Sequence, residues 1–202
     1  MRFGFVRLAN SSFESDISRS SLDSLILTRV ANKDREALAE VYASVQRPLF
    51  RYLFHLLGRK ELAEDVLQEV MVVVWQKAHT YHGSGSVVSW IFGVAHHQAF
   101  KALRRNSDAR TLDLEAVGEF PDEALNPEAD LLRRATSEAI GQALASLTPE
   151  HREVLELAFF QDFSGKEIAA IVGVPQGTVK SRLSYARRAL KAALLRHGWE
   201  EE

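Results

Sequence analysis

The chain has 202 residues, of which 46% are hydrophobic and 26% are charged, and its net charge is −2 at pH 7. These values are ordinary for a globular protein of one large or two small domains, and the bulk charge alone does not indicate a nucleic-acid partner. The absence of cysteine excludes disulfides, thiol catalysis and cysteine-ligated zinc, and no apolar run approaches the ~18 residues of a membrane span. We therefore expect a cytoplasmic protein that does not insert into a membrane.

The first 20 residues are Ser-rich and lack periodicity, so we expect a flexible tail without a signal peptide or an assigned function. From Leu22 onward the apolar residues recur at helical spacing. Pro48 is expected to break or bend the longest of these helices, and Gly58 is expected to end it. The apolar stripe of this helix consists of Leu38, Val41, Tyr42, Val45, Leu49, Leu53 and Leu56.

The next helix is expected over residues 61–79, with a buried face and a second face of acidic character. The buried face contains Ala63, Val66, Leu67, Val70 and Val74. The second face contains Asp65, Gln68, Glu69 and Val72. Two interpretations of this second face remain open: it is a solvated surface, or it is a docking face for a basic partner helix.

Residues 79–86, HTYHGSGS, interrupt the helical pattern, because clustered glycine and serine do not form a helix interior. Ser86 is expected to cap a further helix that extends to Arg105. Aromatic and cationic side chains are interleaved on the exposed face of this helix, and no acidic residue occurs from Val70 to Ser107. This pattern favours single-stranded nucleic acid, whose bases stack and whose phosphates need positive charge. The residues expected to be exposed are Trp90, His97, Gln98, Lys101, Arg104 and Arg105.

Residues 106–130 contain eight acidic residues and one arginine, a local charge of −7, and two prolines interrupt them. We interpret residues 107–129 as an acidic linker. Helices are expected to resume over residues 128–146, and Thr148 followed by Pro149 predicts another helix start. The residues of that helix expected to pack beneath the following segment are Val154, Leu155, Ala158 and Phe159.

Residues 164–194 predict a helix, a tight turn and a longer second helix. Ser164 and Glu167 form a capping box, and Gly173 is expected to end the first helix in the left-handed conformation. Pro175 lies in the turn, and Thr178 is the expected N-cap of the second helix.

The second helix of this segment has an apolar face and a cationic face. The apolar face consists of Val179, Leu183, Ala186, Leu190 and Leu194. The opposite face carries Ser181, Ser184, Tyr185 and Arg188, flanked by Lys180 and Arg187. Six Lys or Arg residues and no acidic residue occur from Ile168 to Trp199, a local charge of +6. This pattern favours a helix-turn-helix that lies in a DNA major groove, and the alternative is an ordinary helical hairpin with a solvated basic face.

The sequence thus predicts an all-α protein of two small helical domains, residues 21–106 and 130–198, joined by the acidic linker. With both halves placed, it resembles the extracytoplasmic-function group of bacterial sigma-70 family sigma factors. AEDVLQEVMVVVWQKA resembles the region-two helix that docks on the polymerase core. GSVVSWIFGVAHHQAFKALRR resembles the segment that melts and reads the minus-ten promoter element. LTPEHREVLELAFFQDFSGKEIAAIVGVPQGTVKSRLSYARRALK is similar to region four, which reads the minus-thirty-five element.

The resemblance implies a dissociable subunit of RNA polymerase that has no chemistry of its own and uses no metal or cofactor. Its partners would be promoter DNA, the clamp helices of the largest polymerase subunit and the beta flap. An anti-sigma factor, which holds many relatives inactive, is a further candidate partner. The acidic linker would thread through the RNA-exit region of the polymerase.

The resemblance also assigns residues to each of these contacts. The clamp helices would be met by Asp65, Gln68, Glu69 and Val72. The minus-ten element would be bound by Trp90, His96, His97, Lys101, Arg104 and Arg105. The minus-thirty-five element would be bound by Thr178, Lys180, Ser181, Ser184, Tyr185, Arg187 and Arg188. Many relatives carry Arg-Asn where His96 and His97 stand here, so the base preference at the minus-ten element stays open.

Two rival functions are suggested by parts of the sequence. A metal enzyme would have to use the pairs His79 with His82 or His96 with His97, but adjacent residues on a helix point about 100° apart and no ligand spacing such as HExxH occurs. A stand-alone helix-turn-helix regulator of duplex DNA accounts for the C-terminal half equally well. It leaves the acidic face, the aromatic-cationic helix and the acidic linker without a role.

Overall fold

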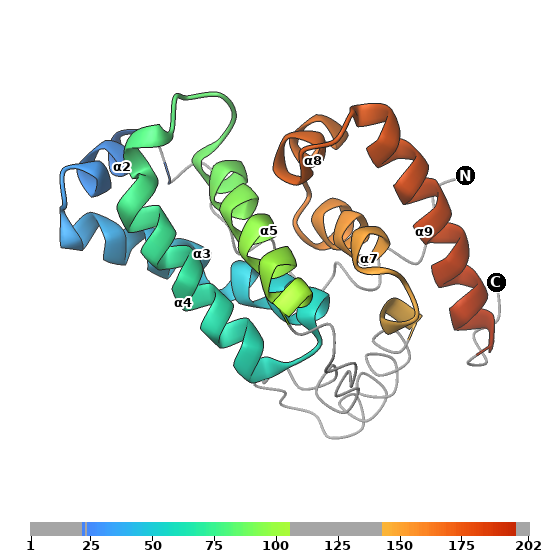
Figure 1. Ribbon diagram of the computed structural model, residues 1–202. Coiled ribbons are helices and arrows are strands. Elements are labelled where there is room, and N and C mark those ends of the chain that lie inside the picture. Colours follow the sequence, from blue (N-terminus) through green and yellow to red (C-terminus); the bar gives the residue numbers. More distant parts are fainter. Residues whose placement is uncertain (1–21, 23, 106–142, 197–202) are drawn as a thin grey trace, which may run out of the picture.

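The computed structural model describes residue 22, residues 24–105 and residues 143–196 (Figure 1). These segments form helices with short connections and contain no strand, as the sequence predicts. In chain order the helices are α2 (Ser24–Ala31), α3 (Arg35–Leu57), α4 (Lys60–Lys77), η1 (Ala78–Thr80), α5 (Val87–Arg105), α7 (Pro149–Leu155), η3 (Glu156–Phe160), α8 (Gly165–Val172) and α9 (Gln176–Arg196). We call residues 24–105 the N-terminal module and residues 143–196 the C-terminal module. The expected tail, the expected acidic linker and most of the helix expected over residues 128–146 lie outside the described residues.

The long helix α3 begins at a carboxylate cap and ends at a glycine. The Asp34 side chain accepts hydrogen bonds from the backbone N–H of Glu36 at 2.9 Å and of Ala37 at 3.1 Å. Gly58 takes the left-handed conformation, with φ 71°, and ends the helix as predicted.

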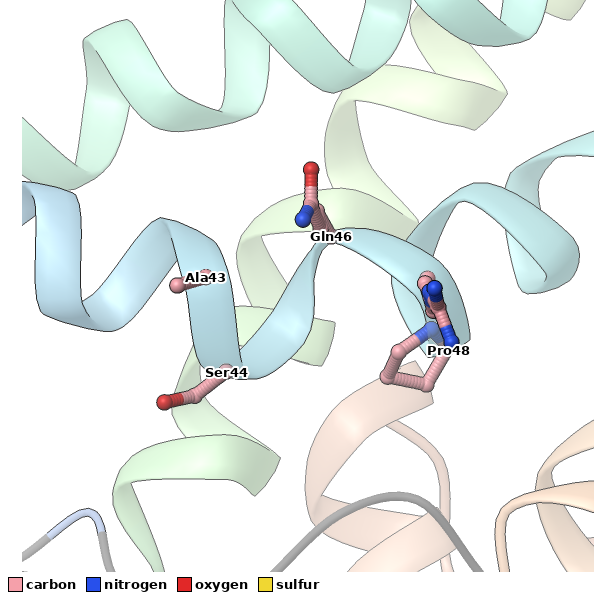
Figure 2. Close-up of a pocket in the computed structure, with 5 residues that line it drawn as sticks. Ala43, Ser44, Gln46 and Pro48 are labelled. Atoms are coloured by element: carbon pink, nitrogen blue, oxygen red, sulfur yellow. The ribbon is translucent and has the colours of Figure 1, made fainter.

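Pro48 lies inside α3, and of the two expected outcomes, a break or a bend, the break does not occur. A proline within a helix removes a backbone hydrogen bond and costs about 3 kcal/mol. The next turns of α3 are anchored in the core, so their packing outweighs this cost. Their buried residues are Leu49, Tyr52, Leu53, Phe54, Leu56 and Leu57. The surface beside the proline is a small pocket that presents one ionisable side chain, Arg47, and therefore no cluster of reactive groups (Figure 2).

Helices α4 and α5 pack against α3 and against each other to complete the core of the N-terminal module. The face of α4 predicted to be buried is buried, including Val66, Val70 and Val74, and α5 buries Ile91, Ala95 and Ala99. In the loop between them, the hydroxyl of Tyr81 donates to the carbonyl of Gly85 at 2.7 Å. Ser86 caps α5 as predicted, because its Oγ accepts the backbone N–H of Ser89 at 3.0 Å.

The C-terminal module is a helix-turn-helix, α8 and α9, packed on α7 and η3. Its capping box is confirmed, because the Ser164 Oγ accepts the backbone N–H of Glu167 at 3.3 Å. In return, the Glu167 carboxylate accepts the backbone N–H of Ser164 at 2.9 Å. Gly173 ends α8 with φ 67°, as predicted.

The start of α9 differs from the prediction, whereas α7 begins at Pro149 directly after Thr148, as predicted. Helix α9 begins at Gln176, so Thr178 is not its N-cap; the carbonyl of Pro175 already accepts the backbone N–H of Thr178 at 2.8 Å. Thr148 does stand at the N-cap of α7, but its side chain makes no capping hydrogen bond to the backbone. Its Oγ1 lies 2.8 Å from Nδ1 of His151 and is hydrogen-bonded to that imidazole instead.

The two modules pack against each other through one continuous apolar cluster, which the sequence did not predict. Figure 1 shows α7 and α8 beside α5, with α9 on the far side. The rings of Phe92 on α5 and Phe163 before α8 meet edge to face, with centroids 5.1 Å apart. A Cβ at Gly93 would lie 3.9 Å from the carbonyl oxygen of Ile171, an ordinary van der Waals distance, so α8 packs directly beside this position of α5.

Two buried carboxylates of the C-terminal module are paired with side chains of the N-terminal module. Glu153 accepts a hydrogen bond from the Tyr52 hydroxyl at 2.6 Å and is bonded to Nδ1 of His96 at 2.7 Å. Glu156 is bonded to Nδ1 of His55 at 2.7 Å. Burial, together with the charge of Glu153, raises the pKa of Tyr52 well above its usual value, so this phenol stays protonated and donates. We call these five side chains the acid network.

Arg152, beside the acid network, is buried and joins two other segments of backbone to α7. Its guanidinium donates to the carbonyls of His55 and Leu56, both at 3.2 Å, in the last turn of α3. It also donates to three carbonyls of the segment before α7, those of Leu144, Ala145 and Leu147. Burial lowers the pKa of Arg152 to about 10, and the group remains charged at neutral pH. A cation at a helix C-terminus is favourable because the carbonyl ends carry partial negative charge.

We expect Arg152→Leu to lower the free energy of unfolding by about 3 kcal/mol, because buried carbonyls would lose their donor. Urea unfolding followed by circular dichroism measures this loss. The exposed Arg35→Leu is the matched control, for which a change within about 0.5 kcal/mol is expected. Equal effects of the two variants would contradict the structural role of Arg152.

Candidate nucleic-acid and partner interfaces

Helix α9 lies at the outer edge of the molecule (Figure 1). It presents a cationic and hydroxyl-bearing stripe to solvent. Its inner face is fixed by Val179, Ala186 and Ala193, which are buried against α7 and α8. Thr178, at the base of the stripe, is only half-exposed. The other residues predicted for this surface are all exposed, namely Lys180, Ser181, Ser184, Tyr185, Arg187 and Arg188. Such a helix can place side chains in a major groove while the rest of the module stays outside it.

The two arginines at the centre of the stripe have different surroundings. The guanidinium of Arg187 lies over the ring of Phe159, 5.0 Å from the ring centroid, in a cation–π contact. Arg188 is the next residue along the helix, so its side chain points about 100° away from that of Arg187. Both are exposed. The resemblance assigns both arginines to the minus-thirty-five element. In the structure, the contact of Arg187 with Phe159 also helps to hold α9 against η3.

Tyr185 is the large aromatic group of the stripe, and 53% of it is exposed. One face of its ring lies against the imidazole of His151 from α7, with ring centroids 4.4 Å apart and planes at 34°. The hydroxyl end and the other face of the ring are therefore available to a partner.

Helix α5 presents an exposed cationic face, as predicted. His97, Lys101, Arg104 and Arg105 are exposed, and Trp90 is half-buried against the edge of Tyr81. Partial burial, with further contributions from neighbouring charges, lowers the pKa of His97. This imidazole is therefore neutral at pH 7 and offers a ring for stacking, while the lysine and arginines supply positive charge.

His96 differs from the other five residues predicted to bind the minus-ten element. Its imidazole faces the C-terminal module and is bonded to the buried Glu153 at 2.7 Å. It lies about 100° around α5 from His97, which puts it on the flank of the cationic face. In this arrangement His96 is a contact between the modules, four of the other five residues are exposed, and Trp90 is half-buried.

The acidic face of α4 is exposed, and it lies next to the cationic face of α5. Asp65, Gln68 and Val72 are exposed, and Val72 is an apolar side chain with 54% exposure. Glu69 is half-exposed, and its carboxylate pairs with the guanidinium of Arg105 at 3.2 Å. A pair this exposed contributes at most about 1 kcal/mol, so a partner with competing cations is able to displace it.

Within residues 24–105 and 143–196, no group of three His, Cys, Asp or Glu side chains is placed to hold a metal ion. In the same part of the chain, no helix is long and apolar enough to cross a membrane.

Comparison with known proteins gives matches over both modules. Residues 41–109 match the family described as Sigma-70 region 2, and residues 143–192 match Sigma-70, region 4. The extracytoplasmic-function RNA polymerase sigma factor RpoE of Cereibacter sphaeroides is 33% identical over 163 residues. That match covers 79% of this chain and 87% of RpoE.

Two solved structures have similar folds. The sigma factor RpoE of Bartonella quintana, in complex with the anti-sigma factor NepR, is 25% identical with a TM-score of 0.60, and the match covers 77% of this chain and 95% of that one. CnrH, in complex with the cytosolic domain of CnrY, is 20% identical with a TM-score of 0.63, and the match covers 85% of this chain and 96% of that one.

We expect Arg188→Ala to weaken binding to all DNA sequences alike and to lower the salt slope, the dependence of log affinity on log salt concentration, by about one unit. Arg187→Ala should change the slope less, because its guanidinium already lies on Phe159. Binding of the full chain, alone or with RNA polymerase core, to promoter duplexes at several salt concentrations measures both slopes. Equal slope changes would show that the Phe159 contact does not restrain Arg187.

Proposed function

The chain belongs to the extracytoplasmic-function group of RNA polymerase sigma factors, and we propose that its two modules divide promoter recognition between them. As a sigma factor it directs transcription initiation as a subunit of RNA polymerase. The observation that supports this division best is the placement of three chemically distinct surfaces on three different helices. These are the stripe on α9, the cationic face of α5 and the acidic face of α4.

We infer that the C-terminal module reads the minus-thirty-five element as duplex DNA. The capped helix-turn-helix holds α9 rigidly while its polar stripe remains outside. Lys180, Ser181, Ser184 and Tyr185 are then the candidates for contacts to base edges, and the two arginines are candidates for phosphate contacts. Thr178, being half-exposed, would contribute at the edge of this surface.

The exposed face of α5 is the proposed surface for the melted minus-ten strand. Trp90 and the neutral His97 offer rings for stacking, and Lys101, Arg104 and Arg105 offer charge for phosphates. The adjacent acidic face of α4, formed by Asp65, Gln68, Glu69 and Val72, is the proposed docking surface for the basic clamp helices of the polymerase. Val72 supplies the exposed apolar contact expected at the centre of such a surface.

These roles require binding and no covalent chemistry, so we propose that the protein is a non-catalytic subunit that works beside RNA polymerase in the cytoplasm. The beta flap of the polymerase is a further proposed partner. An anti-sigma factor is another, by analogy with RpoE in its complex with NepR. A stand-alone regulator of duplex DNA would explain α9 equally well, but it gives no reason for a region-two module with its own two charged faces.

The closed packing of the modules has to open for this function. The two promoter elements are centred about 25 base pairs apart, or about 85 Å along B-form DNA. A compact chain of 202 residues is only about 45 Å across. We therefore propose that the modules separate when the protein joins the polymerase and spans a promoter.

The polar character of the module interface supports such an opening. Separation would return the carboxylates of Glu153 and Glu156 to water, which offsets part of the cost of breaking their hydrogen bonds. Oε2 of Glu153 is buried and has no hydrogen-bond partner among the described residues, so it gains hydration outright. An apolar interface of the same size would gain no comparable hydration energy when the modules separate.

The first test concerns docking through α4. Asp65→Lys and Glu64→Lys make the same charge change at neighbouring exposed positions that point about 100° apart. We expect Asp65→Lys to weaken binding to RNA polymerase core at least tenfold, since a lysine would face a basic surface. Glu64→Lys should bind nearly as the wild type does, measured by fluorescence anisotropy of labelled protein. Equal affinities would contradict the assignment of the acidic face.

The second test concerns opening. Because the chain contains no cysteine, Ala39→Cys and Ala170→Cys, both exposed, place one dye on each module. We expect high energy transfer in the free chain and a clear fall on binding to core polymerase and a promoter. Glu153→Ala should lower the transfer in the free chain as well, because Tyr52 and His96 lose their partner. Unchanged transfer in the promoter complex would rule out separation of the modules.

A further inference from the structure

The side chain of Tyr185 is held by a contact that begins on a different helix. His151 of α7 lies against one face of the Tyr185 ring, with centroids 4.4 Å apart. The imidazole is itself oriented, because its Nδ1 is bonded to Oγ1 of Thr148 at 2.8 Å. Thr148, His151 and Tyr185 therefore form a chain of contacts from the start of α7 to the outward stripe of α9.

The bond between Thr148 and His151 takes the place of an ordinary helix cap. Thr148 stands at the N-cap of α7, where a threonine side chain usually accepts a backbone N–H. Here it makes no such bond and meets the imidazole instead. The backbone of α7 therefore gains no hydrogen bond from this hydroxyl, whose partner in the structure is the His151 ring.

An exposed tyrosine on a helix has more than one rotamer, and a contact on one ring face favours a single one. Base discrimination needs groups held within about 0.5 Å of the productive geometry. We propose that His151 is a positioning residue for the reading of the minus-thirty-five element, acting by fixing the ring of Tyr185. This inference rests on the proposed role of Tyr185 at that element.

A positioning residue and a phosphate contact have different signatures. If His151 touched a phosphate, its loss would weaken all DNA sequences alike. If it orients Tyr185, its loss should flatten the base preference only at the base pairs that Tyr185 affects. The two residues should also be coupled, so that removing His151 has little further effect once Tyr185 is gone.

The experiment uses the full chain in complex with RNA polymerase core and a library of promoters randomised over the minus-thirty-five element. Base preferences are measured for Tyr185→Ala, His151→Ala, their double variant, and His151→Phe, which restores a ring. Thr148→Val removes the hydroxyl at nearly constant shape and cannot uncap α7, because Thr148 makes no cap bond. Tyr42→Ala, which removes an exposed aromatic ring from α3 outside the proposed DNA surfaces, is the control. Thermal unfolding monitors the fold of every variant.

We expect His151→Ala to reduce discrimination by about two- to tenfold at the base pairs affected by Tyr185→Ala, the range typical of an aromatic pair. Thr148→Val should produce a smaller loss at the same base pairs, and His151→Phe should recover part of it. The double variant should match Tyr185→Ala, and Tyr42→Ala should leave the preference at these base pairs unchanged.

Three results would overturn the inference. If Tyr185→Ala alters the preference and His151→Ala does not, His151 is no positioning residue, although the proposed function stands. If His151→Ala weakens binding to all promoters equally, His151 contacts the DNA backbone or has only a structural role. If Tyr185→Ala itself leaves the preference unchanged, the proposed role of Tyr185 fails and the inference fails with it.

Discussion

The arrangement of the molecule depends on two carboxylates that are buried between its modules. A charged group without partners is costly to bury, so Glu153 and Glu156 must be met by donors wherever they are placed. Those donors are Tyr52, His55 and His96, which come from two different helices of the N-terminal module. The carboxylates thereby fix α7 against α3 and α5. The apolar contacts around them, such as that of Phe92 with Phe163, add buried surface area. They do not require particular partner groups in the way that the carboxylates require donors.

Helix α7 carries this constraint through to the recognition helix. Arg152 ties it to the last turn of α3, and Glu153 ties it to α5, while the preceding residue, His151, reaches α9 on the other side. Three consecutive residues therefore face three different parts of the protein, because successive residues of a helix point about 100° apart. The surfaces proposed to bind DNA stay outside the module interface, apart from His96. In the closed form of the molecule, the interface therefore sets how far apart the DNA-reading surfaces lie without covering most of them.

Much of the local structure could be predicted, because short-range rules decide it. The capping box of Ser164, the glycine ends at Gly58 and Gly173 and the cap at Ser86 depend on residues within a turn of each other, and all are confirmed. The exposed positions of the α9 stripe follow from helical periodicity alone. The errors have a common cause in competing contacts. Core packing keeps α3 continuous past Pro48. Helix α9 begins before Thr178, and the carbonyl of Pro175 already accepts the backbone N–H of Thr178.

The sequence by itself determined the helical fold, the helix-turn-helix and which positions of α4, α5 and α9 are charged, because periodicity and capping are encoded locally. It also carried the resemblance to a sigma factor, which the relatives confirm. Only the tertiary structure decided that the modules close on each other, that His96 serves that interface, and that His151 lies on Tyr185. These contacts join residues 34 to 101 positions apart, as in the pair of Tyr52 and Glu153. No periodic pattern reports such a pairing, because it depends on how whole helices dock and on which buried charges must find partners there.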